Sequence, residues 1–469
     1  MTSPARIGFS IDRSLSDPVF EQICSAIRSK VVAGSISAGE TVPPTRVFAT
    51  ELGVSRSTVV TAYEQLVAEG YLTSQQGSGY RVCALGSVEM VRKELQPPMA
   101  PADKSVPQLR PFSAGSPDMR LFPYAQWAKT VSRLCRKDPQ AMLGGGGRQG
   151  HADLRRAIAA HVSEWRGIEA HPDQIIVTAG ASDGVMLCLQ ALMQRGDTIG
   201  LENPGYAPLL HMAELLGHRP QWLQMDAQGA VLPHGKGPRT VVLTPSHQYP
   251  LGGAMSPQRR LDFIRWAEEN DGWILEDDYD SEFRYAGRPI PAMAGFDQLN
   301  RTIYIGSFSK IFSNTLRMGY VVAPQALVPR LMQALRRYGS NASAMPQPAL
   351  AEFIHAGEFY RHLRRVRRVY DVRRQFLLDW LAKHCAEFGH CIDHQAGMQV
   401  VFLLRDGLSD QVIQRKALAR GVDVEALSLA YAAGTPARQG LIMGSCADTE
   451  DEMLPALEII ADILRDIRP

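Results

Sequence analysis

The sequence predicts an α/β domain with a largely parallel sheet, preceded by a small module of helices and one β-hairpin. Between residues 175 and 307, short apolar runs alternate with amphipathic segments, a pattern typical of parallel strands covered by helices on both faces. Residues 19–82 instead have apolar residues at helical spacing, followed by a pattern typical of a β-hairpin. A proline-rich stretch separates the two parts.

Composition limits what the chain can be. With 469 residues it is too long for one ordinary core. A formal net charge of +2 gives no global basic field, so any contact with nucleic acid must come from a local surface. The seven cysteines are scattered singly, which favours reduced thiols over a disulfide frame or a metal site.

Nothing in the sequence predicts export or a membrane anchor. The N-terminus carries Arg6, Asp12 and Arg13 and has no apolar signal-peptide core. No apolar stretch is long enough to cross a bilayer. We therefore expect a cytoplasmic protein.

Changes in composition suggest the domain boundaries. We expect a head over residues 1–84, a linker over 85–111 and a body over 112–469. The linker holds five prolines, at positions 97, 98, 101, 107 and 111. Within the body, a larger part should cover residues 112–335, and a smaller C-terminal α+β part should cover 336–469, where the pattern becomes mainly helical.

The head should open with a helix, since four apolar residues recur at helical spacing: Phe20, Ile23, Ile27 and Val31. Next, "TRVFATELGVSRSTVVTAYEQL" predicts a helix, a tight turn at Gly53 and a second helix capped by Ser55. "YLTSQQGSGYRV" predicts a hairpin that could form a wing.

The second of these helices has two distinct faces. One is apolar, and the other should present Arg56, Ser57, Thr58, Thr61 and Tyr63. Small polar residues and an arginine at a helix start suit base edges and phosphates. Because acidic and basic residues balance in the head, a helical protein–protein module is the alternative to DNA binding.

In the body, polar residues follow the ends of several predicted strands. Lys310 comes just after "TIYIG", with Ser307 and Arg317 nearby as possible phosphate ligands. "VTAGASDG" opens a helix whose first backbone N–H groups, at Ala181 and Ser182, can face an anion. Alone, Lys310 would be an ordinary surface lysine.

Two further strand ends complete a coherent set. "WILEDDYD" ends in Asp277, Asp278 and Tyr279, and "ENPGY" ends in Tyr206. The carboxyl ends of parallel strands meet at one edge, where ligands bind. An amine, an acid, an aromatic ring and a phosphate cradle are what pyridoxal phosphate requires. Strand alternation lets only one of the two aspartates face the ring.

The head resembles the GntR-type winged helix-turn-helix domains across "GETVPPTRVFATELGVSRSTVVTAYEQLVAEGYLTSQQGSGYRV". This resemblance implies binding to double-stranded operator DNA. The implied contacts come from the helix-turn-helix, at Arg46, Ser55, Arg56, Ser57 and Thr58, and from the wing, at Gly77 and Gly79.

The body resembles the fold type I aminotransferases, and the fusion resembles the MocR/GabR regulators. The matching stretches include "GSPDMRLFPYAQW", "PDQIIVTAGASDGV", "TPSHQYPLGGAMSPQRR", "ILEDDYDSEFRY" and "YIGSFSKIFSNTLRMGY". The resemblance implies that Lys310 forms the internal aldimine with pyridoxal phosphate and that Asp277 pairs with its pyridine nitrogen. Other residues would hold its phosphate, phenolate oxygen or ring: Ala181, Ser182, Tyr206, His247, Gln248, Tyr279, Ser307 and Arg317.

One feature departs from that family. A C-terminal strand of these enzymes commonly carries an arginine that clamps the substrate carboxylate, but "GLIMGSC" has Ile442 there. The nearest arginine is Arg438. Either Arg438 or another residue substitutes, or the effector is not a simple carboxylate, and pyridoxal phosphate itself could be the signal.

A second basic feature is the run "YRHLRRVRRVYDVRRQF", in which Arg361, Arg364, Arg365 and Arg368 share one helical face. It is either a solvated face paired with acids or an extra electrostatic surface for DNA or for the head.

Two functions are consistent with these features. The first is a homodimeric transcriptional regulator that senses pyridoxal phosphate, or an effector derived from an amine or amino acid, through Lys310. The second is an active aminotransferase that carries a DNA-binding module. The head and the missing arginine favour a regulator without sustained turnover.

Overall fold

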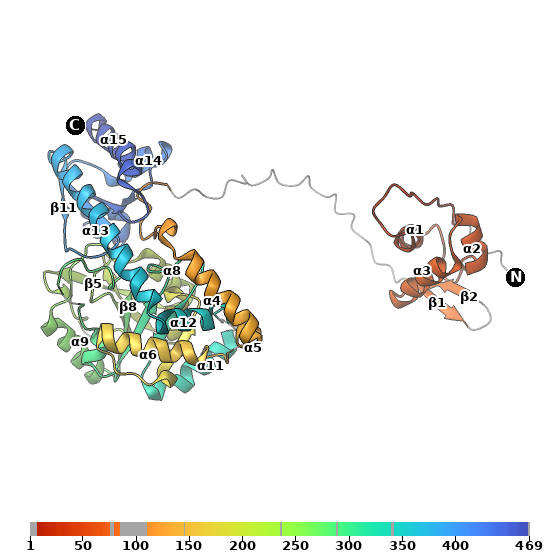
Figure 1. The fold of residues 1–469 in the computed structure, drawn as a ribbon, viewed down its shortest axis with the longest axis horizontal. Helices are drawn as coiled ribbons and strands as arrows, with labels where there is room; N and C mark the ends of the chain where they lie inside the picture. The colour runs from red at the N-terminus through yellow and green to blue at the C-terminus, as the bar shows by residue number, and fades with distance from the viewer. Residues whose placement is uncertain are drawn as a thin grey trace. The chain divides into compact units, whose positions relative to one another are not determined.

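The computed structural model describes residues 7–75, 79–84, 110–144, 146–234, 237–287, 289–338 and 342–467. The chain divides into two compact units, Met1–Val106 and Pro107–Pro469, which are treated separately below (Figure 1). Most of the predicted linker, residues 85–109, lies outside the described residues, as does Gly77 of the predicted wing.

The smaller unit has the predicted order of three helices followed by a hairpin (Figure 1). The elements are α1 (Val19–Val32), α2 (Thr45–Leu52), α3 (Arg56–Ala68), β1 (Leu72–Gln75) and β2 (Gly79–Val82). α2 ends at Gly53, whose φ of 64° is the left-handed conformation that glycine adopts at helix ends. Ser55 caps α3, because its Oγ accepts a hydrogen bond of 3.1 Å from the Thr58 amide.

The prediction that Tyr63 faces solvent is wrong. Its ring is fully buried in the core of the smaller unit, and its hydroxyl donates a hydrogen bond of 2.9 Å to the Pro43 carbonyl. The ring packs edge-on against Tyr80 of β2. Tyr63 therefore joins α3 to the hairpin rather than facing DNA.

In the larger unit, an eight-stranded sheet has the order β3-β10-β9-β8-β7-β4-β5-β6. Its strands are β3 (Ile175–Thr178), β4 (Thr198–Asn203), β5 (Arg219–Asp226), β6 (Gly229–Ala230), β7 (Thr240–Leu243), β8 (Trp273–Asp278), β9 (Thr302–Ser307) and β10 (Gly319–Val322). β10 runs antiparallel to both of its neighbours, and β6 is antiparallel at the edge. The neighbouring pairs from β9 to β5 are parallel, as predicted.

Helices cover both faces of this sheet, which explains its continuous apolar strands. One face packs on α6 (Ala152–Arg166), α12 (Pro346–His355) and α9 (Pro257–Glu269). The other packs on α7 (Ala181–Leu192), α8 (Ala207–Leu215) and α11 (Val328–Tyr338). The remaining helices and turns of this unit are α4 (Tyr124–Lys137), α5 (Pro139–Leu143), α10 (Met293–Phe296) and the 3₁₀ turns Met119–Leu121, Pro172–Gln174, Gln325–Leu327 and Leu427–Ala430.

The C-terminal part is built on an antiparallel sheet of order β11-β12-β14-β13. Its elements are β11 (Gly389–Ile392), β12 (Gln399–Leu404), α14 (Asp410–Ala419), β13 (Glu425–Ala426), β14 (Gly440–Gly444) and α15 (Glu450–Asp466). The long helix α13 (Glu358–His384) packs on the large sheet with its first half and on this smaller core with its second (Figure 1).

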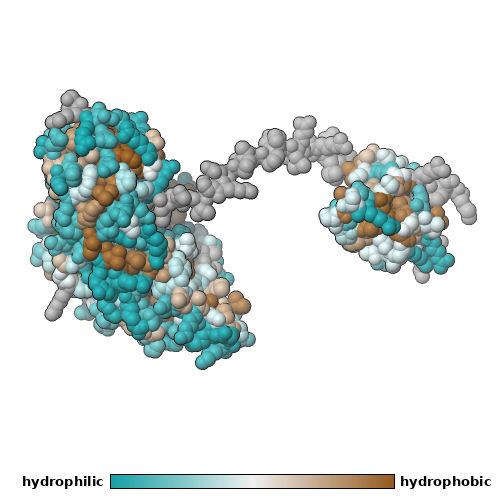
Figure 2. Space-filling model, turned by 45° about the horizontal axis from the view of Figure 1, so that its top comes forward, coloured by the Kyte–Doolittle hydropathy of each residue, from teal (hydrophilic) through white to brown (hydrophobic). Residues whose placement is uncertain are grey.

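The surface matches a protein whose apolar groups are mostly in its cores. Hydrophilic side chains cover most of the face of the larger unit seen in Figure 2, with smaller hydrophobic areas between them. Among the described residues, no helix is both long and apolar enough to cross a membrane.

Candidate functional site

A cavity of about 740 Å³ opens beyond the carboxyl ends of β8 and β9. Its other walls come from the start of α7 and from the C-terminal part. Eight of the ten residues predicted to bind the cofactor line it: Ala181, Ser182, Tyr206, Asp277, Tyr279, Ser307, Lys310 and Arg317. Three strand ends and a helix start therefore meet where the sequence predicted.

Lys310 is half-buried and points toward the first residues of the larger unit. Its Nζ donates a hydrogen bond of 2.7 Å to the Gly115 carbonyl. Gly115 has φ 65°, which favours glycine, and a Cβ there would displace the Lys310 amine from its position. Burial lowers the pKa of the Lys310 amine, which favours the neutral, nucleophilic form.

The two neighbouring aspartates have opposite environments. Asp278 faces away from the cavity, where it forms a buried ion pair of 2.8 Å with Arg166 and accepts hydrogen bonds from Tyr304 and Ser281. Asp277 lines the cavity, and its Oδ1 is buried without a hydrogen-bond partner among the described residues. Burial, reinforced by Asp278, raises the pKa of Asp277 to about 7.

An unpartnered buried carboxyl oxygen is rare and needs a donor to satisfy it. A protonated pyridine nitrogen is such a donor, and its positive charge would also favour the ionised carboxylate. The surroundings of Asp277 therefore fit pyridoxal phosphate, and of the two acids only Asp277 is available.

The opposite side of the cavity suits a phosphate. Gly180, with φ 113°, leads into α7, so the first N–H groups of that helix face the cavity at Ala181 and Ser182. Ser307 and Arg317 line the same cavity. Helix N-termini, hydroxyls and guanidinium groups are the usual ligands of phosphate.

His247 lies behind this cavity rather than in its lining. Its Nδ1 is 3.0 Å from the Tyr279 hydroxyl and donates to the Asp280 carboxylate at 2.9 Å. Although burial disfavours a charged imidazole, Asp280 raises the pKa of His247 above its ordinary value. His247 therefore orients Tyr279 from behind.

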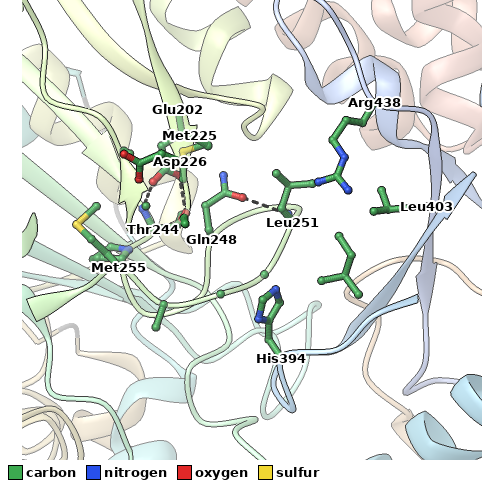
Figure 3. Close-up of a pocket in the computed structure, with 18 of the residues that line it drawn as sticks. Glu202, Met225, Asp226, Thr244, Gln248, Leu251, Met255, His394, Leu403 and Arg438 are labelled. Atoms are coloured by element: carbon green, nitrogen blue, oxygen red, sulfur yellow. Dashed lines mark hydrogen bonds between the residues drawn. The ribbon is translucent and has the colours of Figure 1, made fainter. Parts of the chain in front are cut away.

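Gln248 and Arg438 belong to a different cavity, of about 470 Å³ (Figure 3). The Gln248 amide donates a hydrogen bond of 2.9 Å to the Pro204 carbonyl. Arg438 lines this second cavity together with Glu202 and Leu251. Arg438 is thus not among the residues lining the Lys310 cavity, and it does not replace the missing arginine there.

The predicted DNA contacts gather at the start of α3. Arg46, Ser55, Arg56 and Ser57 are exposed, and Thr58 is half-buried. The Ser55 hydroxyl is hydrogen-bonded to both neighbouring hydroxyls, at 2.7 Å from Ser57 and 2.8 Å from Thr58. Gly79, with φ 85°, begins β2, and a side chain there would meet no other atom within 4 Å.

Four arginines of α13 are exposed and line a groove together with Pro123 and Gln126 of the α4 region: Arg361, Arg364, Arg365 and Arg368. Arg361 pairs with Glu358, and Arg365 donates to the Leu121 carbonyl. Two of the four thus have partners within the chain, as expected of a solvated face. A role as an extra DNA surface stays a prediction.

Comparison with known families matches both parts of the chain. Residues 20–82 match the bacterial regulatory proteins of the gntR family, and residues 111–447 match the class I and II aminotransferases. The probable rhizopine catabolism regulatory protein MocR of Rhizobium meliloti is 35% identical over 92% of this chain and 91% of its own length. The chain belongs to the MocR-type transcriptional regulators.

A second relative is the HTH-type pyridoxine biosynthesis transcriptional regulator PdxR of Corynebacterium glutamicum. It is 37% identical to this MocR-type regulator over 94% of the present chain and 95% of its own length. Because the GntR-type head is shared across nearly full-length relatives, the protein is a DNA-binding transcriptional regulator.

Solved structures place the body of this MocR-type regulator in the aminotransferase fold. An archaeal alanine:glyoxylate aminotransferase gives a TM-score of 0.69 at 23% identity, covering 76% of this chain and 91% of the enzyme. The α-aminoadipate aminotransferase LysN from Thermus thermophilus, complexed with N-(5′-phosphopyridoxyl)-L-leucine, gives 0.68 at 25% identity, covering 76% and 92%. Aminotransferases of this class use pyridoxal phosphate, the cofactor that the surroundings of Lys310 and Asp277 fit.

Sequence reasoning missed several residues of this cavity. Gly115 is the first residue of "GSPDMRLFPYAQW", one of the stretches that resemble the aminotransferases, so it could have been found from that resemblance. Tyr249 lies in another and packs edge-on against both Tyr206 and Tyr279. Glu425 comes from the two-residue strand β13, which has no recognisable sequence pattern.

Proposed function

We propose that this regulator senses a small molecule at the Lys310 cavity and that occupation of the cavity changes the affinity of the head for operator DNA. One contrast carries the proposal. The chain keeps the residues that a pyridoxal phosphate site needs, but Ile442 lines the cavity at the position where the resemblance to aminotransferases implies a carboxylate-binding arginine. The site is thus equipped to hold the cofactor and poorly equipped to turn over common amino acids.

Each residue then has a defined task. When bound, pyridoxal phosphate supplies an aldehyde that amines join reversibly and an electron-withdrawing ring. Lys310 offers a buried amine of lowered pKa, held beside the Gly115 carbonyl. Asp277 would accept a hydrogen bond from the protonated pyridine nitrogen, and Tyr279, oriented by His247, would donate one to the phenolate oxygen. The start of α7, Ser182, Ser307 and Arg317 hold the phosphate.

The proposal extends to the assembly. The head, linker and body occupy residues 1–84, 85–111 and 112–469, and the chain acts as a homodimer in the cytoplasm, where its operator is accessible. A homodimer would present two heads to repeated half-sites about 34–36 Å apart. The effector is either pyridoxal phosphate itself or a molecule that joins it.

An active aminotransferase with an attached DNA-binding module is the second candidate. The observation that favours it is Lys310 itself, since a lowered amine pKa and a partner acid serve turnover as well as sensing. A screen of amino donors and keto acids separates the two. Sustained turnover at about 1 s⁻¹ or faster would be typical of an enzyme and would contradict a pure sensor.

The direct test replaces Lys310 with alanine in the full-length protein. We expect Lys310→Ala to lose the near-visible absorption band that marks covalently held pyridoxal phosphate, and its operator affinity should no longer respond to the cofactor. Lys416→Ala, an exposed lysine on α14, is the matched control and should keep both properties. An unchanged band in Lys310→Ala would contradict the assignment.

A further inference from the structure

We infer that the effector of this regulator is a primary amine without a carboxylate, and that Glu425 recognises its far end through a hydroxyl or a second ammonium group. This inference rests on the proposed sensing function and adds the chemical class of the ligand. It is carried by the composition of the cavity wall that faces away from the phosphate-binding residues.

That wall is formed by the β13–β14 ladder. Glu425 of β13 lies directly opposite Ile442 of β14, and both line the cavity. This wall therefore has an apolar side chain with a carboxylate beside it, at the position where the resemblance implies a guanidinium. The local charge is reversed rather than only removed.

The remaining charges of the cavity cannot compensate. Among the described residues that line it, the cationic side chains are Lys310 and Arg317. Lys310 is the amine-exchanging group, and Arg317 lies with Ser182 and Ser307 on the phosphate side. A ligand carboxylate at the β13–β14 wall would thus face Glu425 without a partner, and burial of like charges disfavours binding.

Of the three acids that line the cavity, Glu425 is the one left for the far end of the ligand. Asp277 is committed to the pyridine nitrogen, and both carboxylate oxygens of Asp280 face His247 Nδ1, at 2.9 and 3.1 Å. Glu425 accepts a hydrogen bond of 3.3 Å from the Tyr249 hydroxyl through Oε2. A carboxylate can accept further hydrogen bonds, so Glu425 can still receive one from a ligand.

A second polar group stands on the same wall. Gln399 lies between this cavity and a smaller neighbouring one, and its Nε2 is buried without a hydrogen-bond partner among the described residues. Gln399 lies on β12, which pairs with β14. Its partner there is Gly444, two residues after Ile442. A hydroxyl on the ligand can accept from this amide and donate to Glu425, which satisfies both groups.

Matched pairs of ligands that differ only by the carboxylate test this inference. We would titrate the full-length protein, loaded with pyridoxal phosphate, with ethanolamine against L-serine and with cadaverine against L-lysine. The readouts are the cofactor absorption spectrum and the affinity for operator DNA. We expect the amine of each pair to act at a concentration at least about tenfold lower than that of the amino acid.

Variants of the β13–β14 wall test whether its residues cause the preference for amines over amino acids. Glu425→Gln should reduce the preference for the amine, and Glu425→Gln with Ile442→Arg should reverse it in favour of the amino acid. Glu458→Gln, on the exposed side of α15, removes the same charge elsewhere and should change nothing. A gain of amino-acid binding in the double variant also shows that the altered protein is folded.

The outcomes separate this inference from the proposed function. If amino acids act at equal or lower concentrations than the amines, or if only pyridoxal phosphate changes operator affinity, the amine assignment is wrong while the sensing function stands. If operator affinity responds neither to pyridoxal phosphate nor to any ligand pair, the sensing function itself is contradicted.

Discussion

Two adjacent carboxylates, Asp277 and Asp278, have opposite roles because a strand sends alternate side chains to opposite faces. Asp278 forms a buried ion pair with Arg166, whose guanidinium is almost fully enclosed. Asp277 has a buried oxygen without a partner among the described residues. One acid therefore stabilises the fold, and the other is poised for the cofactor.

Replacing each acid should separate these roles. Asp278→Ala leaves the Arg166 charge buried and unpaired, so we expect the free energy of unfolding to fall by about 3–5 kcal/mol. Asp277→Ala removes an unsatisfied carboxyl, so the cofactor-free protein should keep its stability while its affinity for pyridoxal phosphate falls. Urea denaturation and cofactor titration measure the two effects; equal losses of stability in both variants would contradict the assignment.

The raised pKa of Asp277 makes stability depend on pH. Burial and Asp278 raise this pKa to about 7, against about 3.9 in an unfolded chain. Between about pH 4 and pH 7 the folded, cofactor-free protein thus binds a proton that the unfolded chain lacks, and its stability falls as pH rises.

Asp277→Asn lacks this contribution. The melting temperature of the native chain minus that of the variant should therefore decrease as pH is raised from about 5 to about 7. Glu202, also with a pKa of about 7, is present in both proteins, and because its charge helps to raise the pKa of Asp277, the difference reports Asp277 together with this coupling. A difference that stays constant with pH would mean that the Asp277 carboxyl is not buried as described.

At the scale of elements, α3 is the helix that we propose contacts DNA. Arg56 is its first residue and is exposed, with its Nε 3.5 Å from the Thr45 hydroxyl. Arg56→Ala should weaken operator binding about tenfold or more, without changing cofactor content.

Lys30→Ala in α1 makes the same change in net charge outside the helix-turn-helix and should have a much smaller effect. If the two variants bind operator equally well, net charge rather than the start of α3 governs affinity. The salt dependence of binding is a further check, because loss of one phosphate contact lowers its slope by about one.

Helices and strands also show how much of the structure sequence patterns could predict. The gathering of Lys310, Ser182 and the Asp277–Asp278 pair at one edge was predictable because they lie at the ends of continuous apolar strands, and parallel strands bring their carboxyl ends together. The choice of Asp277 over Asp278 rested on the family resemblance. The winged helix was predictable from the turn at Gly53 and the cap at Ser55.

Other residues depend on tertiary contacts that no local pattern encodes. Tyr63 has helical spacing compatible with either face and is buried because it reaches Pro43 and Tyr80. Glu425 lies on a strand of two residues, and only its pairing opposite Ile442 places it in the cavity. Gln248 adjoins the site in sequence, but its amide is bonded to Pro204 and faces another cavity.

At the scale of the whole molecule, the proposed sensing function requires two separable units joined through residues 85–111. Residues 1–84 expressed alone should fold and bind operator more weakly than the full chain, because a dimeric body would no longer hold two heads together. This affinity should not respond to pyridoxal phosphate. A head that responds to the cofactor by itself would show that the body is not the sensor.

Coupling between the units is the property that defines a ligand-responsive regulator, and it must be reciprocal. The most direct measurement is the affinity of the full-length protein for a duplex selected from a random pool, with and without pyridoxal phosphate, in the native chain and in Lys310→Ala. We expect the cofactor to change native affinity by about 5–150-fold, in keeping with usual coupling energies, and to leave that of Lys310→Ala unchanged. If the absorption spectrum shows that the native protein holds pyridoxal phosphate and its affinity for DNA is nevertheless unchanged, the proposed sensing function is contradicted.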